Sequence, residues 1–468
     1  MRKQKAFLAA LIMSVMVFPV TACTKSGKNS GTDKKQEYTM PAEKKEQLDQ
    51  AAENEKNVIL DGELENKTVK WMSDWDINPT ETDPVPHADL YYFQEVYGGN
   101  IEYYHVDYDK RYDKLAESIS SGEGIDLFFA GNGDAIPKGA IREMFIPVDD
   151  YVDFESPLWK DVKKVNDSIM WNDKHYTAVV QTTGDSVAVL YNRKTIQEAG
   201  LEDPAVLYEN DEWTWDAFQE MLEEFVDMDN QRYGIDGWWF EFGLMNTTGV
   251  PPVSISDGKI VSNLADPNME RVQNWLYELH QKGLIAIGSE GYGWEDKPNY
   301  IGEGKLLFYP VGLYELYGSP ELWQEKYGED VFFVPMPKDP KADEYYVPAK
   351  MEAYSIVTGA SNPEGAAKYL DCKRYVLMNS EARAISDTMY KDSYGWTQEM
   401  IDMKDSIQKL ADENPVIDIS RGVSADCGEI LDNSLRNSAK GTPWNETYDS
   451  ISATVQKYID KVNSGKTD

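Results

Sequence analysis

The chain has 468 residues, with 46 lysines and arginines against 82 aspartates and glutamates, which gives a formal net charge of −36 at pH 7. A surface this acidic repels the phosphate backbone of nucleic acids, so nucleic acid is excluded as a natural partner. About 400 residues follow position 64, more than one hydrophobic core usually serves, and two lobes are therefore expected.

The N-terminus predicts an exported lipoprotein. Three basic residues within the first five positions precede an apolar run at 6–18 that one serine interrupts, and the run is shorter than the roughly 20 residues that span a bilayer. This pattern is typical of a secretory signal peptide, here assigned to residues 1–22. Val, Thr and Ala at 20–22 followed by Cys23 resemble the lipobox of bacterial lipoproteins, which implies that Cys23 becomes an N-terminus acylated with lipid such as palmitate. The alternative is an ordinary signal peptide, with Cys23 an incidental thiol.

Residues 23–64 are predicted to form a flexible tether between the lipid and the folded body. The stretch from 24 to about 57 is rich in charged and small polar residues, so it cannot bury enough apolar surface to offset the entropy lost on ordering. One or two helical turns near its end are an alternative, but Leu48, Ala51 and Ala52 would make a poor apolar face. No later stretch of 18 apolar residues occurs in the sequence, so the body is expected on the extracytoplasmic face of the cell membrane.

The cysteines stand at positions 23, 372 and 427. With Cys23 assigned to lipid, one pair of cysteines remains. In the oxidising environment of an exported protein, such a pair can form a disulfide. Two buried free thiols are the alternative, because free cysteine behaves as a small apolar side chain. The sequence leaves both interpretations open.

The body alternates short apolar runs with amphipathic segments, which predicts an α/β protein. The segments TVKWMSDW, YDKLAESIS and IDLFFAG show this alternation between positions 68 and 131. Gly200 is expected to end a helix that begins near Thr195. Thr214 is expected to cap a helix that runs to about Asp227. Pro363 suits the first turn of a later helix, where its missing N–H makes no helical hydrogen bond in any case.

Six segments of the body, in chain order, carry the motifs of one known family. In the second of them, Tyr191 and Asn192 are followed by Ala199, Gly200 and Leu201. A Pro-Val-Asp-Asp-Tyr turn in the first segment and a Trp-Thr-Trp-Asp helix start at the end of the second match as well. Together they resemble the family 1 extracellular solute-binding proteins, the group that includes maltose-binding protein. The segments are 122–152, 173–221, 225–240, 301–316, 331–340 and 353–370.

This resemblance, which covers most of residues 67–375, implies a two-lobe periplasmic-binding-protein-like fold of type II. Hinge segments would join the lobes, and a ligand would be held in the cleft between them. The family topology would give one lobe from 65–182 plus 311–349 and the other from 183–310 plus 350–468. It also implies a monomer that delivers a carbohydrate, either a sugar or an oligosaccharide, to the transmembrane permease subunits of an ABC importer.

The first strand of the body ends in candidate ligand residues. A sugar offers hydroxyl groups at its edges and apolar C–H faces, so its site needs aromatic rings and carboxylates or amides. Asp74, Trp75 and Asp76 follow the strand directly, at the carboxyl end where open α/β sheets present ligand loops. The family also has an acidic residue at about this point. A surface or packing role for Trp75 is the alternative.

The resemblance implies further contacts at loops and crossings. The loop after the IDLFFA strand carries hydroxyl-binding residues in the family, which points to Asn132 and Asp134. Asp185 aligns with a ligand-contacting carboxylate at the first crossing, and Tyr314 takes the place of a stacking tryptophan at the second. Glu352 borders the third crossing, where it could also face the ligand.

Three consecutive large aromatic residues, Trp238, Trp239 and Phe240, follow a short apolar strand. They cannot all face one core from a strand whose side chains alternate between two sides. At least one of Trp238 and Trp239 is therefore expected to reach the cleft.

Two other functions remain open. An exported carbohydrate-active enzyme such as a glycosidase needs two carboxylates about 5 to 10 Å apart, and 82 acidic residues make such pairs unavoidable. The four histidines show no metal-ligand spacing, and the sequence has no GxSxG, Walker or HExxH motif. No catalytic residue, metal or cofactor is therefore predicted. An anchored adhesin or a ligand-presenting partner of a membrane sensor could use the same fold.

Overall fold

The computed structural model describes residues 39–81, 85–131, 133–237, 239–286, 297–318 and 320–467. The predicted signal peptide, the lipidated Cys23 and the tether before residue 39 lie outside the described residues. Within the described ranges, no helix is long and apolar enough to cross a membrane.

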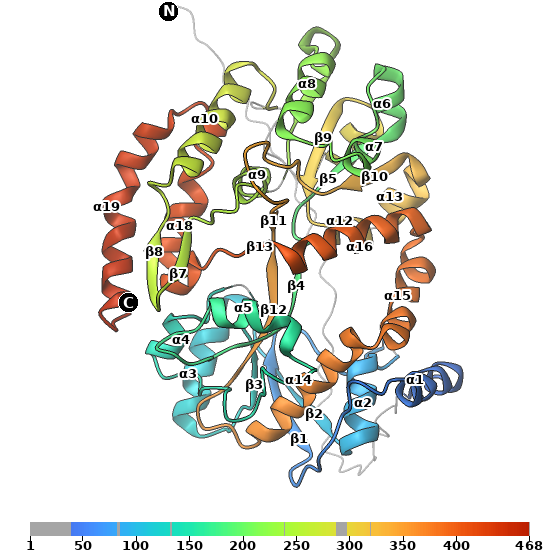
Figure 1. The fold of residues 1–468 in the computed structure, drawn as a ribbon, viewed down its shortest axis with the longest axis vertical. Coiled ribbons are helices and arrows are strands. Elements are labelled where there is room, and N and C mark those ends of the chain that lie inside the picture. The colour runs from blue at the N-terminus through green and yellow to red at the C-terminus, as the bar shows by residue number, and fades with distance from the viewer. Residues whose placement is uncertain are drawn as a thin grey trace, which may run out of the picture. The chain divides into compact units, whose positions relative to one another are not determined.

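The first sheet has the strand order β2, β1, β3, β12, β4. β1 runs parallel to β2 and β3, whereas β12 runs antiparallel to β3 and β4 (Figure 1). Side chains alternate across β1, so that Trp71 packs into the core on one face of the sheet and Met72 into the core on the other. The strands are β1 (Thr68–Ser73), β2 (Asn100–His105), β3 (Leu127–Phe129), β4 (Ala178–Thr183) and β12 (Lys350–Ile356).

Helices cover both faces of this sheet, and the sheet with these helices is called the first lobe below. α2 and α14 pack on the face of Trp71, and α3 and α4 pack on the face of Met72. α14 begins as predicted, because the Asn362 side chain accepts a hydrogen bond from the backbone N–H of Gly365 at 2.9 Å and Pro363 occupies the first turn. The helices are α1 (Ala42–Asn54), α2 (Ala88–Tyr97), α3 (Arg111–Ser121), α4 (Lys138–Ile141), α5 (Lys163–Ser168) and α14 (Pro363–Met378).

Helix α1 corrects the predicted extent of the tether, because it packs on the first lobe. Leu48 and Ala51 are 0% and 1% exposed and belong to the core beneath α2 and α14. The carbonyl of Leu48 accepts a hydrogen bond from the hydroxyl of Tyr92 at 2.8 Å, and the carbonyl of Ala51 accepts one from the amide of Asn379 at 2.9 Å. A narrow apolar face is enough here, since side chains distant in sequence bind the backbone of the helix.

The second sheet has the strand order β10, β5, β9, β6. β5 is antiparallel to β10 and β9, and β6 is parallel to β9. Every residue of β5, β9 and β10 is buried, as expected for strands covered on both faces. The strands are β5 (Ala188–Asn192), β6 (Tyr233–Ile235), β9 (Leu306–Val311) and β10 (Val331–Val334).

The helices around the second sheet complete the second lobe. α6 ends at Gly200, whose φ is 74°, and Thr214 caps α8 by accepting from the backbone N–H of Ala217 at 3.4 Å. Both predicted caps are confirmed. The helices are α6 (Arg193–Ala199), α7 (Pro204–Glu209), α8 (Trp215–Phe225), α9 (Phe240–Asn246), α10 (Pro267–Gln281), α11 (Lys297–Gly302), α12 (Tyr314–Gly318), α13 (Pro320–Tyr327), α16 (Gln398–Glu413), α17 (Ser420–Val423), α18 (Ala425–Ser434) and α19 (Trp444–Asn463).

Smaller elements complete the described fold. An antiparallel hairpin pairs β7 with β8, and a short parallel pair joins β11 to β13. Their bounds are Val253–Ser256 for β7, Lys259–Ser262 for β8, Val347–Pro348 for β11 and Pro415–Val416 for β13. The 3-10 helices are Tyr108–Lys110, Lys160–Val162, Met228–Asn230, Gly328–Asp330 and Ser438–Lys440.

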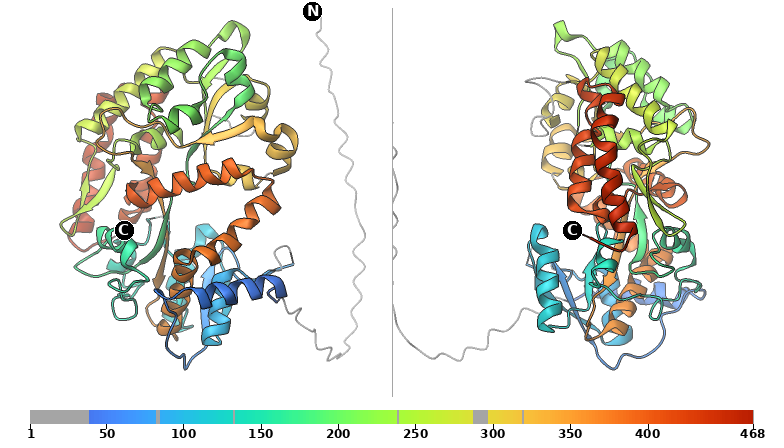
Figure 2. Two further views of the ribbon diagram at one scale, coloured as in Figure 1. Left: turned by 45° about the vertical axis from the view of Figure 1, so that its right-hand side comes forward. Right: turned by 90° about the vertical axis from the view of Figure 1, so that its left-hand side faces the viewer.

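The strand pairing differs from the predicted division of the lobes. Residues 311–349 were expected beside β1, yet β10 within them pairs with β5 in the second sheet. Residues 350–378 were expected in the other lobe, yet β12 fills the space between β3 and β4, and α14 packs on α2. α15 (Ser380–Tyr394) then leads the chain back to α16 beside the second sheet (Figure 2). The residues at which the lobes divide stay a prediction.

Cys372 and Cys427 are both free and buried. Cys372 belongs to α14 in the first lobe and Cys427 to α18 in the second. The disulfide alternative is wrong, and both thiols pack as small apolar side chains. Burial raises the pKa of the Cys427 thiol to about 12, so this thiol stays protonated at neutral pH.

Candidate functional site

A cavity of about 540 Å³ is lined by residues of both lobes. Its lining comes from the loop after β3, from the segments that join the lobes, and from α9, α12 and α18. Small-molecule sites usually measure roughly 300 to 1,000 Å³, so the cavity has a suitable size. The lining residues used below are Trp239, Phe242, Tyr314, Lys350, Asp418, Arg421 and Asp432.

Aromatic rings form one part of this lining. Trp239 and Phe242 meet edge to face, with ring centroids 5.1 Å apart, and Tyr314 is 41% exposed. The φ of Trp239 is 69°, a left-handed conformation that bulky residues rarely adopt and that is typical of binding sites. The guanidinium carbon of Arg436 lies 4.2 Å from the centroid of the Trp239 ring and stabilises the ring by a cation–π contact. These rings can stack on the apolar face of a ligand.

Asp418 follows β13 and lines the same cavity. Its Oδ1 accepts hydrogen bonds from the backbone N–H groups of Val253 and Ser420, both at 3.2 Å. Burial raises the pKa of Asp418 to about 6; the hydrogen bonds from Ser420 oppose this rise and the nearby charge of Asp432 adds to it. Asp418 therefore ties the segment after β13 to the start of β7.

Arg421 and Asp432 form an ion pair in this lining. Burial raises the pKa of Asp432, and the charges of Arg421 and Arg436 oppose that rise. Arg421 keeps 51% of its side chain exposed, so most of its N–H donors face solvent or the cavity.

The structure brings together two of the predicted ligand residues, Trp239 and Tyr314, in this cavity. Asp185 lies beside it, because the next two residues in the chain line the cavity. Asn132 and Trp238 are outside the described residues. The ligand role of all five stays a prediction.

Asp74, Trp75 and Asp76 follow β1 as predicted, but they are not among the lining residues. Trp75 is 38% exposed and packs edge-on against Phe129, with ring centroids 4.8 Å apart. Asp76 accepts hydrogen bonds from the backbone and the side chain of Asn78, both at 2.9 Å. The structure thus places these residues at the carboxyl end of the first sheet.

The carboxylate of Asp134 is engaged within the first lobe. It forms a buried ion pair with Arg111 and accepts a hydrogen bond from the hydroxyl of Tyr112 at 2.8 Å. Asp134 therefore joins the loop after β3 to α3.

Glu352 is likewise engaged in the interior. Its Oε1 lies 2.9 Å from the amine of Lys373 and accepts a hydrogen bond from the hydroxyl of Tyr354 at 2.8 Å. Its Oε2 accepts from the amide of Gln181 at 2.6 Å. Burial alone would raise the pKa of Glu352, but the charge of Lys373 outweighs it and the pKa is lowered. This carboxylate connects α14 to β4 and β12.

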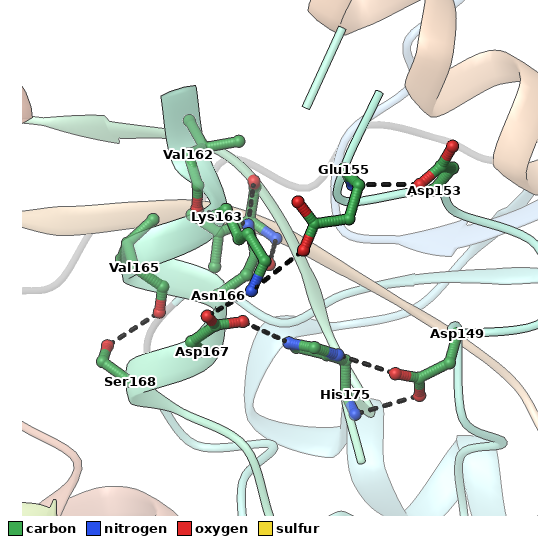
Figure 3. Close-up of polar contacts among 11 residues, drawn as sticks. Asp149, Asp153, Glu155, Val162, Lys163, Val165, Asn166, Asp167, Ser168 and His175 are labelled. Atoms are coloured by element: carbon green, nitrogen blue, oxygen red, sulfur yellow. Dashed lines mark hydrogen bonds and ion pairs between the residues drawn. The ribbon is translucent and has the colours of Figure 1, made fainter. Parts of the chain in front are cut away.

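A second cavity, of about 610 Å³, shares Val416 and Ile417 with the first, so the segment at β13 separates the two. Helix α5 forms part of its wall. Figure 3 shows how α5 is fixed: His175 lies between Asp149 and Asp167, with nitrogen–oxygen distances of 2.7 and 3.1 Å. Asp149 belongs to the Pro-Val-Asp-Asp-Tyr turn, whose function in this chain is thus to position α5.

Several lining residues were not predicted from the sequence. Phe242 is a single aromatic residue within a helix, and Asp418, Arg421 and Asp432 lie in the C-terminal part that resembles the family least. An aspartate two residues before the serine that opens α17 is a local signal for a cap, but not for a ligand site. Among the described residues, no group of three or more His, Cys, Asp or Glu side chains could hold a metal ion.

The sequence matches the family described as bacterial extracellular solute-binding protein over residues 76–372. This match covers well over half of the chain and confirms the predicted resemblance. Over 121 residues, the chain is 27% identical to the maltotriose-binding protein of Pyrococcus abyssi (strain GE5 / Orsay). That alignment covers 26% of this chain and 23% of the relative, so the chain matches about a quarter of the relative's length.

Solved structures share the fold. A cyclo/maltodextrin-binding protein complexed with maltotetraose has a TM-score of 0.60 and 16% identity, over 87% of this chain and 100% of that protein. The galacto-N-biose-/lacto-N-biose I-binding protein of Bifidobacterium longum, in complex with lacto-N-biose, has a TM-score of 0.57 and 12% identity, over 89% and 100%. The predicted two-lobe α/β fold of type II is confirmed by this likeness.

Proposed function

Because the chain belongs to the bacterial extracellular solute-binding protein family, we propose that it is the substrate-binding subunit of an ABC importer. In this proposal it captures a carbohydrate in the 540 Å³ cavity and delivers it to the transmembrane permease subunits. The observation that carries the proposal is the pairing of two aromatic rings, the partly buried Trp239 and the exposed Tyr314, with charged hydrogen-bonding groups in one cavity.

The lining suits the two kinds of surface on a sugar. The C–H face of a sugar ring can stack on Trp239 or Tyr314, and its hydroxyl groups can bond to charged side chains such as Arg421. A micromolar dissociation constant corresponds to about −8 kcal/mol. Two ring contacts and a few hydrogen bonds to charged groups reach that magnitude.

The similar proteins support a saccharide as the ligand class. Their names state binding of maltotriose and complexes with maltotetraose and lacto-N-biose. These ligands differ in size and linkage, so they support the class of ligand and not one compound.

The position of the cavity supports a binding function. A ligand there would contact both lobes and the segments that join them. Because such contacts are stronger in a closed arrangement, the ligand shifts the population toward closure, which the permease can recognise. No bond of the ligand needs to break, so we expect the ligand to be released unchanged and the protein to act as a binding subunit, not as an enzyme. We also expect the protein to be a monomer.

The proposal includes anchoring through an acylated Cys23 at the extracytoplasmic face of the membrane. Labelling of cells with a palmitate analogue tests this part. We expect the label on the wild-type protein and its loss in Cys23→Ser, with release of the protein into the medium. Label retained on Cys23→Ser would refute the anchor and leave the ligand proposal intact.

Calorimetric titration of residues 24–468 tests the ligand proposal, with maltotriose, maltotetraose, lacto-N-biose, a mixed tripeptide and spermidine as probes. We expect at least one saccharide to bind at one site per chain and to be recovered intact. Binding of the peptide or polyamine alone would contradict the proposal. Cleavage of a saccharide during incubation would favour the exported enzyme.

A further inference from the structure

Two basic side chains line the 540 Å³ cavity beside two acidic ones, although the chain as a whole carries 82 acidic against 46 basic residues. Lys350 and Arg421 line the cavity. The amine of Lys138 donates a hydrogen bond to the carbonyl of Arg421 at 3.3 Å. Burial lowers the pKa of Lys138; the charge of Asp134 opposes this change, and the cations Arg142, Arg111 and Arg421 add to it.

The acidic groups at the same place already have partners. Asp418 accepts the backbone N–H groups of Val253 and Ser420, as well as the hydroxyl of Ser420. Asp432 is paired with Arg421. These two carboxylates thus hold the lining together through their own hydrogen bonds and ion pair.

Lys350 differs from them, because its amine forms no hydrogen bond or ion pair with any described residue. It is exposed at the first position of β12, opposite Thr183 of β4, and the next residue, Met351, is buried. A strand therefore fixes the backbone from which this ammonium group extends. Arg421 has five N–H donors, and the structure uses one of its nitrogens, for Asp432. Two cations with unused donors thus line a cavity that also contains aromatic rings.

We propose that this cavity selects an anionic saccharide, whose carboxylate or sulfate group binds Lys350 and Arg421 while its sugar ring stacks on Trp239 or Tyr314. The inference rests on the proposed carbohydrate-binding function and names the substrate class of the same site. A protein with a net charge of −36 repels an anion at long range. The ammonium group of Lys350 and the unused donors of Arg421 are what such a ligand requires for binding.

Matched ligand pairs that differ only in charge test the proposal. The pairs are the disaccharides of glucuronate, galacturonate and mannuronate, each against its methyl ester, and galactose 6-sulfate against galactose. Calorimetric titration is carried out with residues 24–468 at low and at physiological salt. We expect the charged member of at least one pair to bind about tenfold more tightly, since a hydrogen bond between charged groups is worth about one to two orders of magnitude. The preference should weaken as salt increases.

The variant Lys350→Met should lose this preference, because its affinity for the charged member should fall toward that for the neutral member. Lys259→Met removes an exposed lysine of the β8 strand that does not line the cavity, and should keep the preference. A preference for the uronates identifies a carboxylate ligand, and a preference for the sulfate identifies a sulfated sugar. If neutral saccharides bind as tightly as their charged partners, the inference fails and the proposed function stands. If no saccharide of any charge binds, the proposed function fails with it.

Discussion

The amine of Lys373 lies 2.9 Å from Oε1 of Glu352 and 2.8 Å from Oδ2 of Asp89, so one buried cation is shared by two carboxylates. We expect Glu352→Gln to reduce the free energy of unfolding by about 3 kcal/mol, because removing one partner of a buried ion pair leaves charge uncompensated. Asp89 remains, which keeps the loss at the lower end of the usual range. Urea unfolding of the variant and the wild type measures the difference.

Glu329→Gln is the control for this measurement, since Glu329 is exposed beside β10. Its unfolding free energy should stay within about 0.5 kcal/mol of the wild type. If Glu352→Gln were equally neutral and instead abolished saccharide binding, Glu352 would be a ligand residue, as the sequence predicted.

Glu352 also shows what the sequence could not determine. The family resemblance implied a crossing near this position, and in the structure the pairing of β12 with β4 shifts register between Glu352 and Ala353. Such a shift moves a side chain to the other face of a sheet, and no local residue pattern marks it. Direction into the cleft or into the core was therefore not predictable from spacing alone.

Local signals predicted most of the fold correctly. Caps at Gly200 and Thr214, the helix start at Pro363 and the alternating α/β pattern depend on neighbours within a few residues, and all are confirmed. The exchange of β10 and β12 between the sheets depends on pairing across more than 130 residues, and the lobe predicted for each of these strands was wrong. Trp239 was proposed for a similar reason, because three adjacent rings are a local signal, whereas Tyr314 came from the family resemblance and Phe242 was not predicted. The buried partner of Asp134 is distant in sequence and was missed.

Replacement of either aromatic ring, Trp239 or Tyr314, should weaken saccharide binding. We expect Trp239→Ala and Tyr314→Ala each to raise the dissociation constant of the best saccharide about tenfold or more, because each removes a stacking surface worth roughly 1.5 to 3 kcal/mol. Tyr151→Ala is the matched control, since Tyr151 is similarly exposed but does not line the cavity. Calorimetric titration compares all three. Unchanged binding in both cavity variants would place the ligand elsewhere.

The packing of α1 predicts where the folded body begins. A chain that starts at residue 39 should unfold at the same temperature as one that starts at residue 24. A chain that starts at residue 58 lacks α1 and with it the buried side chain of Leu48, so its melting temperature should be several degrees lower. Removal of a buried leucine side chain usually lowers the free energy of unfolding by about 2 to 5 kcal/mol. Leu48→Ala should reproduce much of this loss, and Glu46→Ala, at an exposed position of the same helix, should not. Equal melting temperatures for all of these chains would show that α1 adds no stability, as expected if residues 23–64 form a flexible tether.

The buried carboxyl of Asp418 predicts a dependence of stability on pH. Its pKa of about 6 in the folded chain is above the value of about 3.9 for an unfolded aspartate, so the folded state binds the proton more tightly. Ionisation of Asp418 therefore lowers the free energy of unfolding as the pH rises from about 4 to 6. Above pH 6 the carboxyl is ionised in both states, and the loss of stability is complete. Asp418→Asn keeps an oxygen that accepts the N–H groups of Val253 and Ser420 but carries no charge. Above pH 6 the free energy of unfolding of this variant should therefore exceed that of the wild type by on the order of 2 kcal/mol. Below pH 4 this advantage should vanish.

Urea unfolding at half-unit steps from pH 4 to 7.5 measures the difference in the free energy of unfolding between Asp418→Asn and the wild type at each pH. Asp257→Asn in the exposed β7–β8 turn is the control. A flat difference curve for Asp418→Asn would show that this carboxyl titrates normally, and that the cavity wall it lines is open to water.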